Sequence, residues 1–210
     1  MSALMSVRGA RTRLTDRHGD ARREIADVLL QTCNEHRLGS VHDHARASEL
    51  ARETARRLEL APDAVASVEL AARLHDIGKI AIPDAILEKP GPLNEREWAV
   101  MRTHAEAGAR IIAAAPALAD VAALVRSHHE CYDGGGYPEG LAGDQIPLGA
   151  CIIGVCAAFL AMMRKRPYVD AITVLEAIAE LERCSGSQFH PRVVEAFREV
   201  FHELFVPPAA

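Results

Sequence analysis

Histidine and carboxylate side chains gather in three short segments of this chain, which read RLHDIGK, MRTHAEAG and RSHHE. Their polar members of interest are His75, Asp76, Lys79, His104, His128 and His129. Imidazole and carboxylate groups together suit divalent ions such as Fe, Mn, Ni or Zn. The two oxygens of one carboxylate can also bridge two ions, whereas an imidazole nitrogen binds one. The three segments therefore indicate a metal site built from distant parts of the chain.

Each of these residues also has a simpler interpretation. A single histidine is more often a surface residue or a satisfied core residue than a ligand, and His75 with Asp76 can be a hydrogen-bonded pair. Their occurrence together in three otherwise apolar segments favours the metal site. A structural cluster, in which an ion only joins helices, stays open as an alternative.

A glycine-rich segment begins two residues after His129. CYDGGGYPEGLAGDQIPLG, residues 131–149, holds six glycines and two prolines in nineteen residues. Consecutive glycines permit positive φ angles and a close approach of the backbone to another group. A plain connection would usually be shorter. We therefore expect a compact functional loop.

The apolar segment CIIGVCAAFLAMM, residues 151–163, has no charged, amide or hydroxyl side chain. It is shorter than the about 20 apolar residues that cross a bilayer as a helix. We therefore expect a buried helix and no membrane segment, with Ile152, Val155, Phe159 and Met162 facing the core.

Composition narrows the class of protein. Hydrophobic residues make up 49% of the chain but aromatic residues only 4%, which favours packed aliphatic helices. The net charge of −5 gives no electrostatic sign of a polymeric nucleic acid partner. The five cysteines form no C-x-x-C pair, and the start lacks an apolar signal core. These features predict reduced thiols and a cytoplasmic location.

Apolar periodicity and turn signals predict an all-α fold. Helices are expected over residues 21–36, from the Gly39–Ser40 break to about 60, from 62 into LHDIGK, and over 94–115, 116–129, 150–163, 171–183 and 190–204. Asn94 should cap its helix, with Glu97 at the third position. Residues 82–94 carry three prolines and are expected to form a loop or a broken turn.

Three motifs in sequence order resemble a known family: LHDIGKIAIPDAILEKPGPLNEREWAVMRTHAEAGARII, then HHECYDGGGYPEGLAGDQIP, then RPY. Over about residues 41–197 the chain resembles the HD-GYP subfamily of HD-domain metal-dependent phosphohydrolases. The resemblance implies an HD-domain-like helical bundle with a glycine-rich GYP loop. It also implies two or three bound metal ions and hydrolysis of bacterial cyclic di-GMP to the linear dinucleotide or GMP.

The resemblance gives a role to each motif residue. The implied metal ligands are His75, Asp76, His104, His128 and His129. Asp76 would bridge two ions, Lys79 would contact the scissile phosphate, and both would be catalytic. Gly136, Tyr137 and Pro138 match the GYP signature, and Gly136, Tyr137 and Arg166 would help to bind substrate. Metal-ion pairs of this kind activate a water and neutralise charge on the phosphate that it attacks.

The sequence departs from the family in the first core helix. Aligning Arg46 with the family's arginine places Asp43 where a histidine ligand belongs, and Asp43 is a further candidate ligand because carboxylates bind hard divalent ions. His42 and His44 flank it and could ligate only if the helix is shifted or begins later. Gly39 replaces an acidic ligand of the members with three ions. We therefore expect two divalent ions at most, Fe or Mn in preference to Zn, Ni or Mg.

A second departure lies within the apolar segment. Counting back from RPY, Ala157 and Leu160 occupy the positions of an Asp-x-x-Asp pair that share one helix face. The first aspartate is a metal ligand in the family, and the second helps to hold substrate. One metal position thus keeps its full set of ligands, whereas the other is weakened. Val169 and His190 also replace family residues, a basic side chain and an aspartate.

The chain is accordingly expected to be a divergent, stand-alone HD-GYP member. Residues 1–20 would form a mobile basic arm, residues 21–38 an N-terminal helix, and residues 39–205 the HD-GYP-like domain. The helix should pack on the core in preference to pairing with another chain. The predicted function is metal-dependent hydrolysis of cyclic di-GMP or a related cyclic dinucleotide, with weakened activity. The alternative is a catalytically degenerate regulator that binds a nucleotide, a signalling protein or a second copy of the chain.

Overall fold

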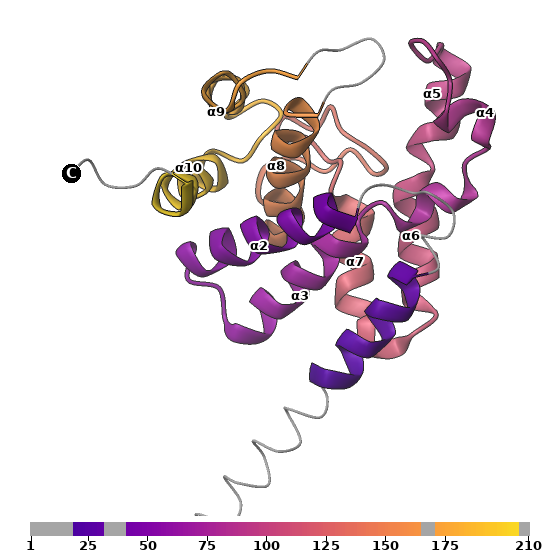
Figure 1. Cartoon of the computed structure of the whole chain (residues 1–210), viewed down its shortest axis with the longest axis horizontal. Helices are drawn as coiled ribbons and strands as arrows, with labels where there is room; N and C mark the ends of the chain where they lie inside the picture. Colours follow the sequence, from indigo (N-terminus) through magenta and orange to yellow (C-terminus); the bar gives the residue numbers. More distant parts are fainter. Residues whose placement is uncertain (1–18, 32–40, 165–170, 206–210) are drawn as a thin grey trace, which may run out of the picture.

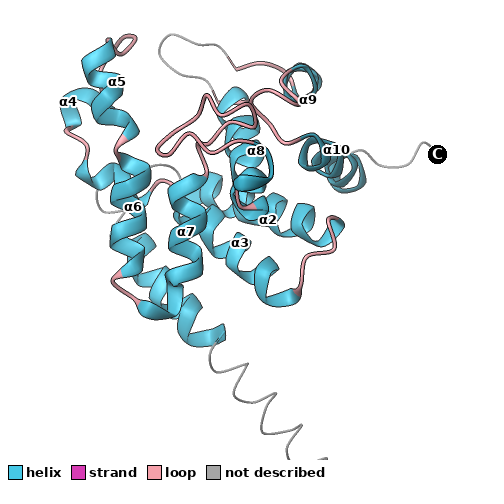
Figure 2. Ribbon diagram, turned by 180° about the vertical axis from the view of Figure 1, so that it is seen from behind, coloured by secondary structure: helices cyan, strands magenta, loops and turns pink. Residues whose placement is uncertain are grey.

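The structure is a computed structural model that describes residues 19–31, 41–164 and 171–205. Within these ranges the chain is helical and has no strand (Figure 2); the only extended pairings there are single bridges between Asp133 and Ala142 and between Ser185 and Phe189. The predicted all-α fold is confirmed.

The helices follow one another in a chain with short connections. They are a first helix over residues 19–31, then α2 (Val41–Arg57), α3 (Pro62–Leu74), α4 (Asp84–Leu87), α5 (Glu95–Arg102), α6 (His104–Ala113), α7 (Ala119–Ser127), α8 (Leu148–Met162), α9 (Val174–Arg183) and α10 (Pro191–Phe205). Short 3-10 turns lie at η1 (Ile77–Ala81), η2 (Pro116–Leu118) and η3 (Gly143–Gln145).

Helix α3 lies at the centre of the bundle and packs against α2, α7 and α8 (Figure 1). Its proline at the first position fixes a φ angle suited to a helix start, as predicted. Val65, Val68, Ala72 and Leu74 recur at helical spacing and are buried. The apolar side of α3 thus forms the core, and the end of the helix carries the segment LHDIGK to one side of the bundle.

Helix α8 is the apolar segment of the sequence, and it is a buried helix as predicted. Ile152, Val155 and Phe159 are fully buried, whereas Met162 is only half-buried. The ring of Phe159 lies 5.0 Å from that of Phe197, centroid to centroid, on α10. Among the described helices, none is both long and apolar enough to span a bilayer.

The N-terminal helix packs on the core, which was the preferred interpretation. Ala26 and Leu30 are buried in the hydrophobic core. Arg22 pairs with Asp120 at 2.8 Å. Residues 1–18 and 32–40 lie outside the described residues. They hold the predicted arm, residues 1–20, except for 19 and 20, which belong to this helix, and they also hold the end of the predicted helix.

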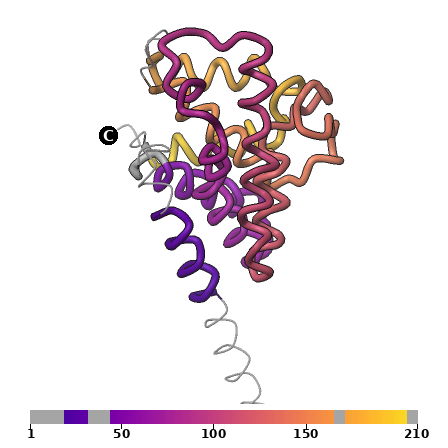
Figure 3. The backbone as a smooth tube through the Cα atoms, turned by 90° about the vertical axis from the view of Figure 1, so that its right-hand side faces the viewer, coloured from indigo at the N-terminus to yellow at the C-terminus, as the bar shows by residue number. Residues whose placement is uncertain are grey.

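One prediction of local structure was wrong, and a second was incomplete. The helix predicted over residues 94–115 is two helices, α5 and α6, because the chain breaks at Thr103, whose hydroxyl donates to the Val100 carbonyl at 2.8 Å. The capping box of Asn94 and Glu97 is present as predicted. The proline-rich segment 82–94 contains one helical turn, α4. Helices α4 and α5 project from the rest of the molecule (Figures 1 and 3), and neither has a buried residue.

A close backbone contact holds the turn η1 against α6. A β-carbon added to Gly78 would lie 1.9 Å from the carbonyl oxygen of His104 and 2.4 Å from the amide nitrogen of Gly108. Atoms cannot approach that closely, and backbone cannot yield as a flexible side chain can. Only glycine therefore lets the LHDIGK segment reach the start of α6.

We predict that Gly78→Ala lowers the free energy of unfolding by about 3 kcal/mol or more, because an overpacked core site must shift backbone on both elements. Urea denaturation measures the loss. Gly91→Ala is the matched control, since a β-carbon at Gly91 meets nothing within 4 Å. Equal stability of the two variants would contradict the contact.

Candidate functional site

A chain of histidine rings crosses the interior between four helices. Ring centroids are 6.0 Å apart for His44 and His75, 5.5 Å for His75 and His128, 5.6 Å for His104 and His128, and 4.9 Å for His104 and His129. The structure therefore brings together the histidines of all three motifs that the sequence singled out.

The positions of these rings follow from where the helices end. His75 is the C-cap residue of α3, His128 is the C-cap residue of α7, and His104 is the first residue of α6. The rings thus meet where three helix ends converge. The predicted helix through residues 94–115 would have placed His104 in mid-helix, and the break at Thr103 makes it a terminal residue instead.

The backbone fixes three of the rings in the same way. The Nδ1 atoms of His75, His104 and His128 lie 2.9, 2.7 and 2.6 Å from the carbonyl oxygens of the residues three positions before them. A carbonyl can only accept a hydrogen bond, so Nδ1 carries the proton in each ring. In a neutral ring Nε2 then presents its lone pair, which is the arrangement that a metal-binding histidine needs.

His104, His128 and His129 can hold an ion together. One ring nitrogen from each lies within 4.8 Å of the others. Nε2 of His128 is buried and has no hydrogen-bond partner among the described residues. Nε2 of His129 lies 3.1 Å from Nε2 of His104. A buried acceptor without a partner destabilises the protein, and a divalent ion would satisfy it, so the donor set fits a metal.

Burial also keeps these nitrogens free of protons. Burial, with further repulsion from neighbouring rings, lowers the pKa of His128 well below its ordinary value and that of His129 to about 3. Burial lowers the pKa of His104 as well, although Asp76 partly opposes the shift. At neutral pH the three rings are therefore neutral, the form that binds metal.

Asp76 lies between the two halves of the histidine cluster. One half is His75, and the other is the group of His104, His128 and His129. Its Oδ2 accepts from the Lys79 ammonium at 2.6 Å and is 3.5 Å from Nε2 of His75, whereas its Oδ1 is 3.9 Å from Nε2 of His104. Burial alone would raise the pKa of Asp76, but His75 and Lys79 outweigh it and hold that pKa well below its ordinary value. The carboxylate is thus ionised, with one oxygen toward each half, as a bridging ligand requires.

The glycine-rich loop covers one side of the cluster. The ring of Tyr137 stacks on His129, with centroids 4.8 Å and planes 25° apart, and burial raises the pKa of its hydroxyl. Gly136 permits this path, because a β-carbon there would lie 2.2 Å from the amide nitrogen of Cys131. The buried carboxylate of Glu130 accepts from the amides of Glu139 and Leu141 at 2.7 and 3.0 Å. Sequence reasoning did not single out Glu130.

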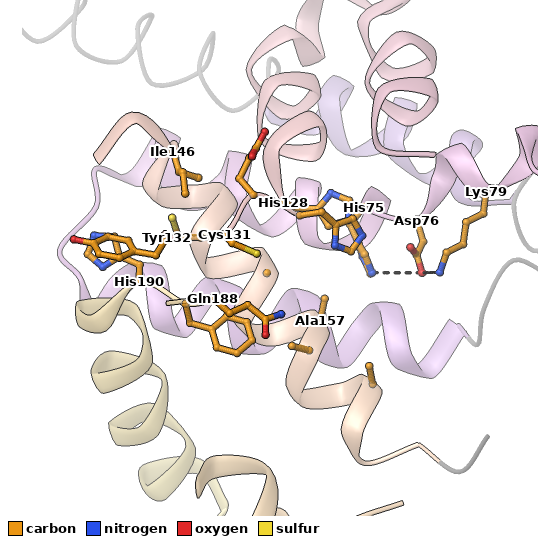
Figure 4. Close-up of a pocket in the computed structure, with 17 residues that line it drawn as sticks. His75, Asp76, Lys79, His128, Cys131, Tyr132, Ile146, Ala157, Gln188 and His190 are labelled. Carbon is orange, nitrogen blue, oxygen red and sulfur yellow. Dashed lines mark hydrogen bonds and ion pairs between the residues drawn. The ribbon is translucent and has the colours of Figure 1, made fainter. Parts of the chain in front are cut away.

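A cavity of about 230 Å³ opens beside the cluster (Figure 4). His75, Asp76 and Lys79 line one end. Ala157, on α8, lies on the wall across from His75. Leu160 is not among the lining residues and packs against the core instead, so the expectation that both residues face the site was wrong for Leu160. Ala158 and Ala161 complete an uncharged wall on the same helix.

Some of the predicted site residues lie outside the described part of the chain. Arg166, Gly39 and Val169 are in undescribed segments, and the side chain of Asp43 is likewise not described. The structure places His44 beside His75 and buries it, with 8% of the residue exposed. His44 lies three, four and seven residues before the buried Ala47, Ser48 and Ala51, and this spacing could have identified it.

Comparisons with known proteins agree on one family. The family model described as HD domain matches residues 24–193. A cyclic di-GMP phosphodiesterase of Thermotoga maritima is 38% identical over 86% of this chain and 50% of its own length. The cyclic di-GMP phosphodiesterase response regulator RpfG of Xanthomonas campestris pv. campestris is 44% identical over 72% of this chain and 40% of its own length. The chain thus spans half or less of these two relatives.

A solved structure shows the same fold. Bd1817, a HDG"Y"P protein from Bdellovibrio bacteriovorus, superposes with a TM-score of 0.65 at 16% identity, over 87% of this chain and 64% of that chain. At this identity the likeness concerns the arrangement of the helices.

We predict that the metal-free protein loses stability as the pH falls from 7 to 5. The pKa values of His128 and His129 are lowered by folding, so the unfolded chain binds protons below about pH 6.5 that the folded chain does not. Below that pH, each ring lowers the free energy of unfolding by about 1.4 kcal/mol per pH unit. The lowered pKa of Asp76 acts only near and below pH 3.8 and stays outside this window.

Urea unfolding of the protein in chelator at pH 7, 6 and 5 measures this slope. His129→Asn should make the slope shallower, and His202→Asn, at an exposed position of α10, should leave it unchanged. Stability that is flat over this range would show that the rings titrate as solvated histidines.

Proposed function

The chain belongs to the HD domain family, and we propose that it is an HD-GYP member and a metal-dependent phosphodiesterase acting on cyclic di-GMP or a related cyclic dinucleotide. The observation that carries the proposal is the placement of Asp76. Its two oxygens face different halves of the histidine cluster, and its second oxygen also accepts from Lys79. A carboxylate placed to bridge two ions suits hydrolysis of a phosphodiester at a two-metal site, and the adjacent lysine can stabilise charge on the phosphate.

We propose that one ion is held by His104, His128, His129 and Asp76. A second would use the other oxygen of Asp76 with His75, and α2 offers His44 beside it. Fe or Mn is the proposed metal, because mixed imidazole and carboxylate ligands suit both. When bound, such ions supply an activated water and neutralise charge on the phosphate.

The residues of the chain have their own tasks in this proposal. Lys79 donates to Asp76 at 2.6 Å, and this contact positions its ammonium group to stabilise negative charge developing on phosphate oxygens. The carbonyl bonds to Nδ1 hold the rings of His75, His104 and His128 in one orientation. Tyr137 covers one face of His129 and limits its contact with water.

A second candidate function, nucleotide binding without turnover, is supported by one observation. Ala157 lines the cavity across from His75 at the position where the family carries a carboxylate. A site with one ligand fewer on that side would still bind a phosphate while hydrolysing it slowly. Measurement of turnover separates the two functions.

We predict that the Mn²⁺- or Fe²⁺-loaded protein hydrolyses cyclic di-GMP, and that Asp76→Asn lowers the rate more than about 100-fold, since the loss of a ligand exceeds the 10–100-fold effect of a residue that only supports one. Chromatography of the guanosine products measures the rate. Asp84→Asn, exposed on α4, is the control and should keep full activity. Tight binding of cyclic di-GMP by the loaded protein without turnover would favour the second function.

We further predict that Ala157→Asp raises the rate about 10-fold or more and increases the metal content per chain, because it adds a carboxylate to the wall across from His75. Ala161→Asp is the matched control, as it adds the same charge one helical turn further along the same cavity wall. A higher metal content without a higher rate would show that this ligand does not limit hydrolysis.

A further inference from the structure

The cavity continues away from the metal-ligand candidates into a second end, between the glycine-rich loop, α8 and the turn before α10 (Figure 4). We call this end the distal arm. Its lining includes Cys131, Tyr132, Ile146, Cys151, Gln188 and His190. The mechanism described above uses none of these residues.

One ring nitrogen of His190 is buried without a hydrogen-bond partner among the described residues. Its side chain is 10% exposed, and its Nδ1 makes no hydrogen bond with any described residue. Its Nε2 is 3.9 Å from the Asp144 carboxylate, which is too far for a hydrogen bond. Burial lowers the pKa of His190, so the ring is neutral and offers one donor and one acceptor. A buried polar atom of this kind can form a hydrogen bond with a ligand that enters the cavity.

Apart from Lys79 at the opposite end, the described residues that line the cavity include no lysine or arginine. Cys131 and Cys151 act as small apolar groups, and burial raises the pKa of the Cys151 thiol to about 11. Ile146 is buried, and the Tyr132 ring lies 5.0 Å from that of His190. Such walls do not suit a phosphate. They suit a flat, uncharged group with polar atoms at its edge.

The two sides of the arm are held at a fixed separation. The amides of Tyr132 and Asp133 donate to the carbonyls of Gln188 and Ser187 at 3.1 and 2.8 Å. These bonds tie the glycine-rich loop to the turn before α10. The side-chain amide of Gln188 points into the cavity and offers both donors and an acceptor (Figure 4).

The size of the cavity limits what enters it. At about 230 Å³ it is smaller than the roughly 300–1,000 Å³ of clefts that enclose a drug-sized ligand. A cyclic dinucleotide therefore enters in part, with a phosphate at the end formed by His75, Asp76 and Lys79 and one attached nucleoside directed along the cavity.

We propose that the distal arm is a nucleobase subsite, in which His190 and Gln188 hydrogen-bond to the edge of one purine of the substrate. This assignment rests on the proposed function, because it takes the phosphate end of the cavity as the reacting end. It adds that the protein recognises one base of the dinucleotide within the cavity and leaves the other half outside.

Binding of guanosine 5′-monophosphate and of ribose 5-phosphate to the Mn²⁺-loaded full chain tests the subsite without turnover. Guanosine 5′-monophosphate should bind the native protein more tightly than ribose 5-phosphate. His190→Phe keeps a ring beside Tyr132 but cannot hydrogen-bond. It should weaken guanosine 5′-monophosphate binding about tenfold and leave ribose 5-phosphate binding unchanged. Gln188→Ala should act in the same direction, and His202→Phe, exposed on α10, should change neither.

The outcomes are distinct from those that test the proposed function. Equal binding of the two probes by the native protein, or equal loss of both in His190→Phe, would overturn the nucleobase subsite. Hydrolysis of bis(p-nitrophenyl) phosphate, a diester without a nucleobase, reports on the metal centre alone and should be the same in His190→Phe and in the native protein. Absence of that hydrolysis in the native protein, together with base-dependent binding, would count against the proposed hydrolysis and still support the subsite.

Discussion

The contact of two backbones at Gly78 determines whether there is a site at all. Asp76 and Lys79 lie on the segment that follows α3, whereas His104 begins α6. The two segments are distant in the sequence, so chain connectivity does not hold them together. The space that a β-carbon would need at Gly78 is occupied by the His104 carbonyl and the Gly108 amide. Because the contact is made by main-chain atoms on both sides, it fixes the distance from Asp76 to His104 more firmly than side-chain packing could.

The buried site carries little net charge, because its ionised groups compensate each other over a short distance. Two buried histidines and the half-buried His129 are neutral, and the Asp76 carboxylate is compensated by a lysine on the next helical turn. Uncharged rings avoid the large penalty of burying several like charges together. The same balance leaves ring nitrogens with lone pairs and few partners, so the stability of the metal-free protein is reduced at the positions that a cation would occupy.

Features encoded by neighbouring residues were predictable from sequence, and features that depend on distant contacts were not. Asn94 with Glu97 and Pro62 at a helix start follow from local hydrogen bonding and fixed dihedrals, and both are present. The break at Thr103 has no glycine or proline to signal it.

Alignment to the family pointed to Asp43 in the first core helix, whereas packing buries His44 beside His75. Ala157 faces the cavity as expected, but Leu160 turns to the core. Such distinctions depend on how a helix is rotated in the bundle, which spacing alone leaves open.

The carbonyl bonds to Nδ1 of His75, His104 and His128 have a consequence for the choice of ion. These rings become ordered when the helices form, so a binding ion does not lose affinity by having to order them. This gain in affinity is the same for every ion that accepts the same arrangement of ligands. A rigid group of imidazoles follows the general order of divalent affinities and discriminates little between adjacent metals. The ion that is most abundant in the cell during folding would then occupy the centre. The bound metal, and with it the chemistry of the protein, would depend on the metal supply under which the protein was made.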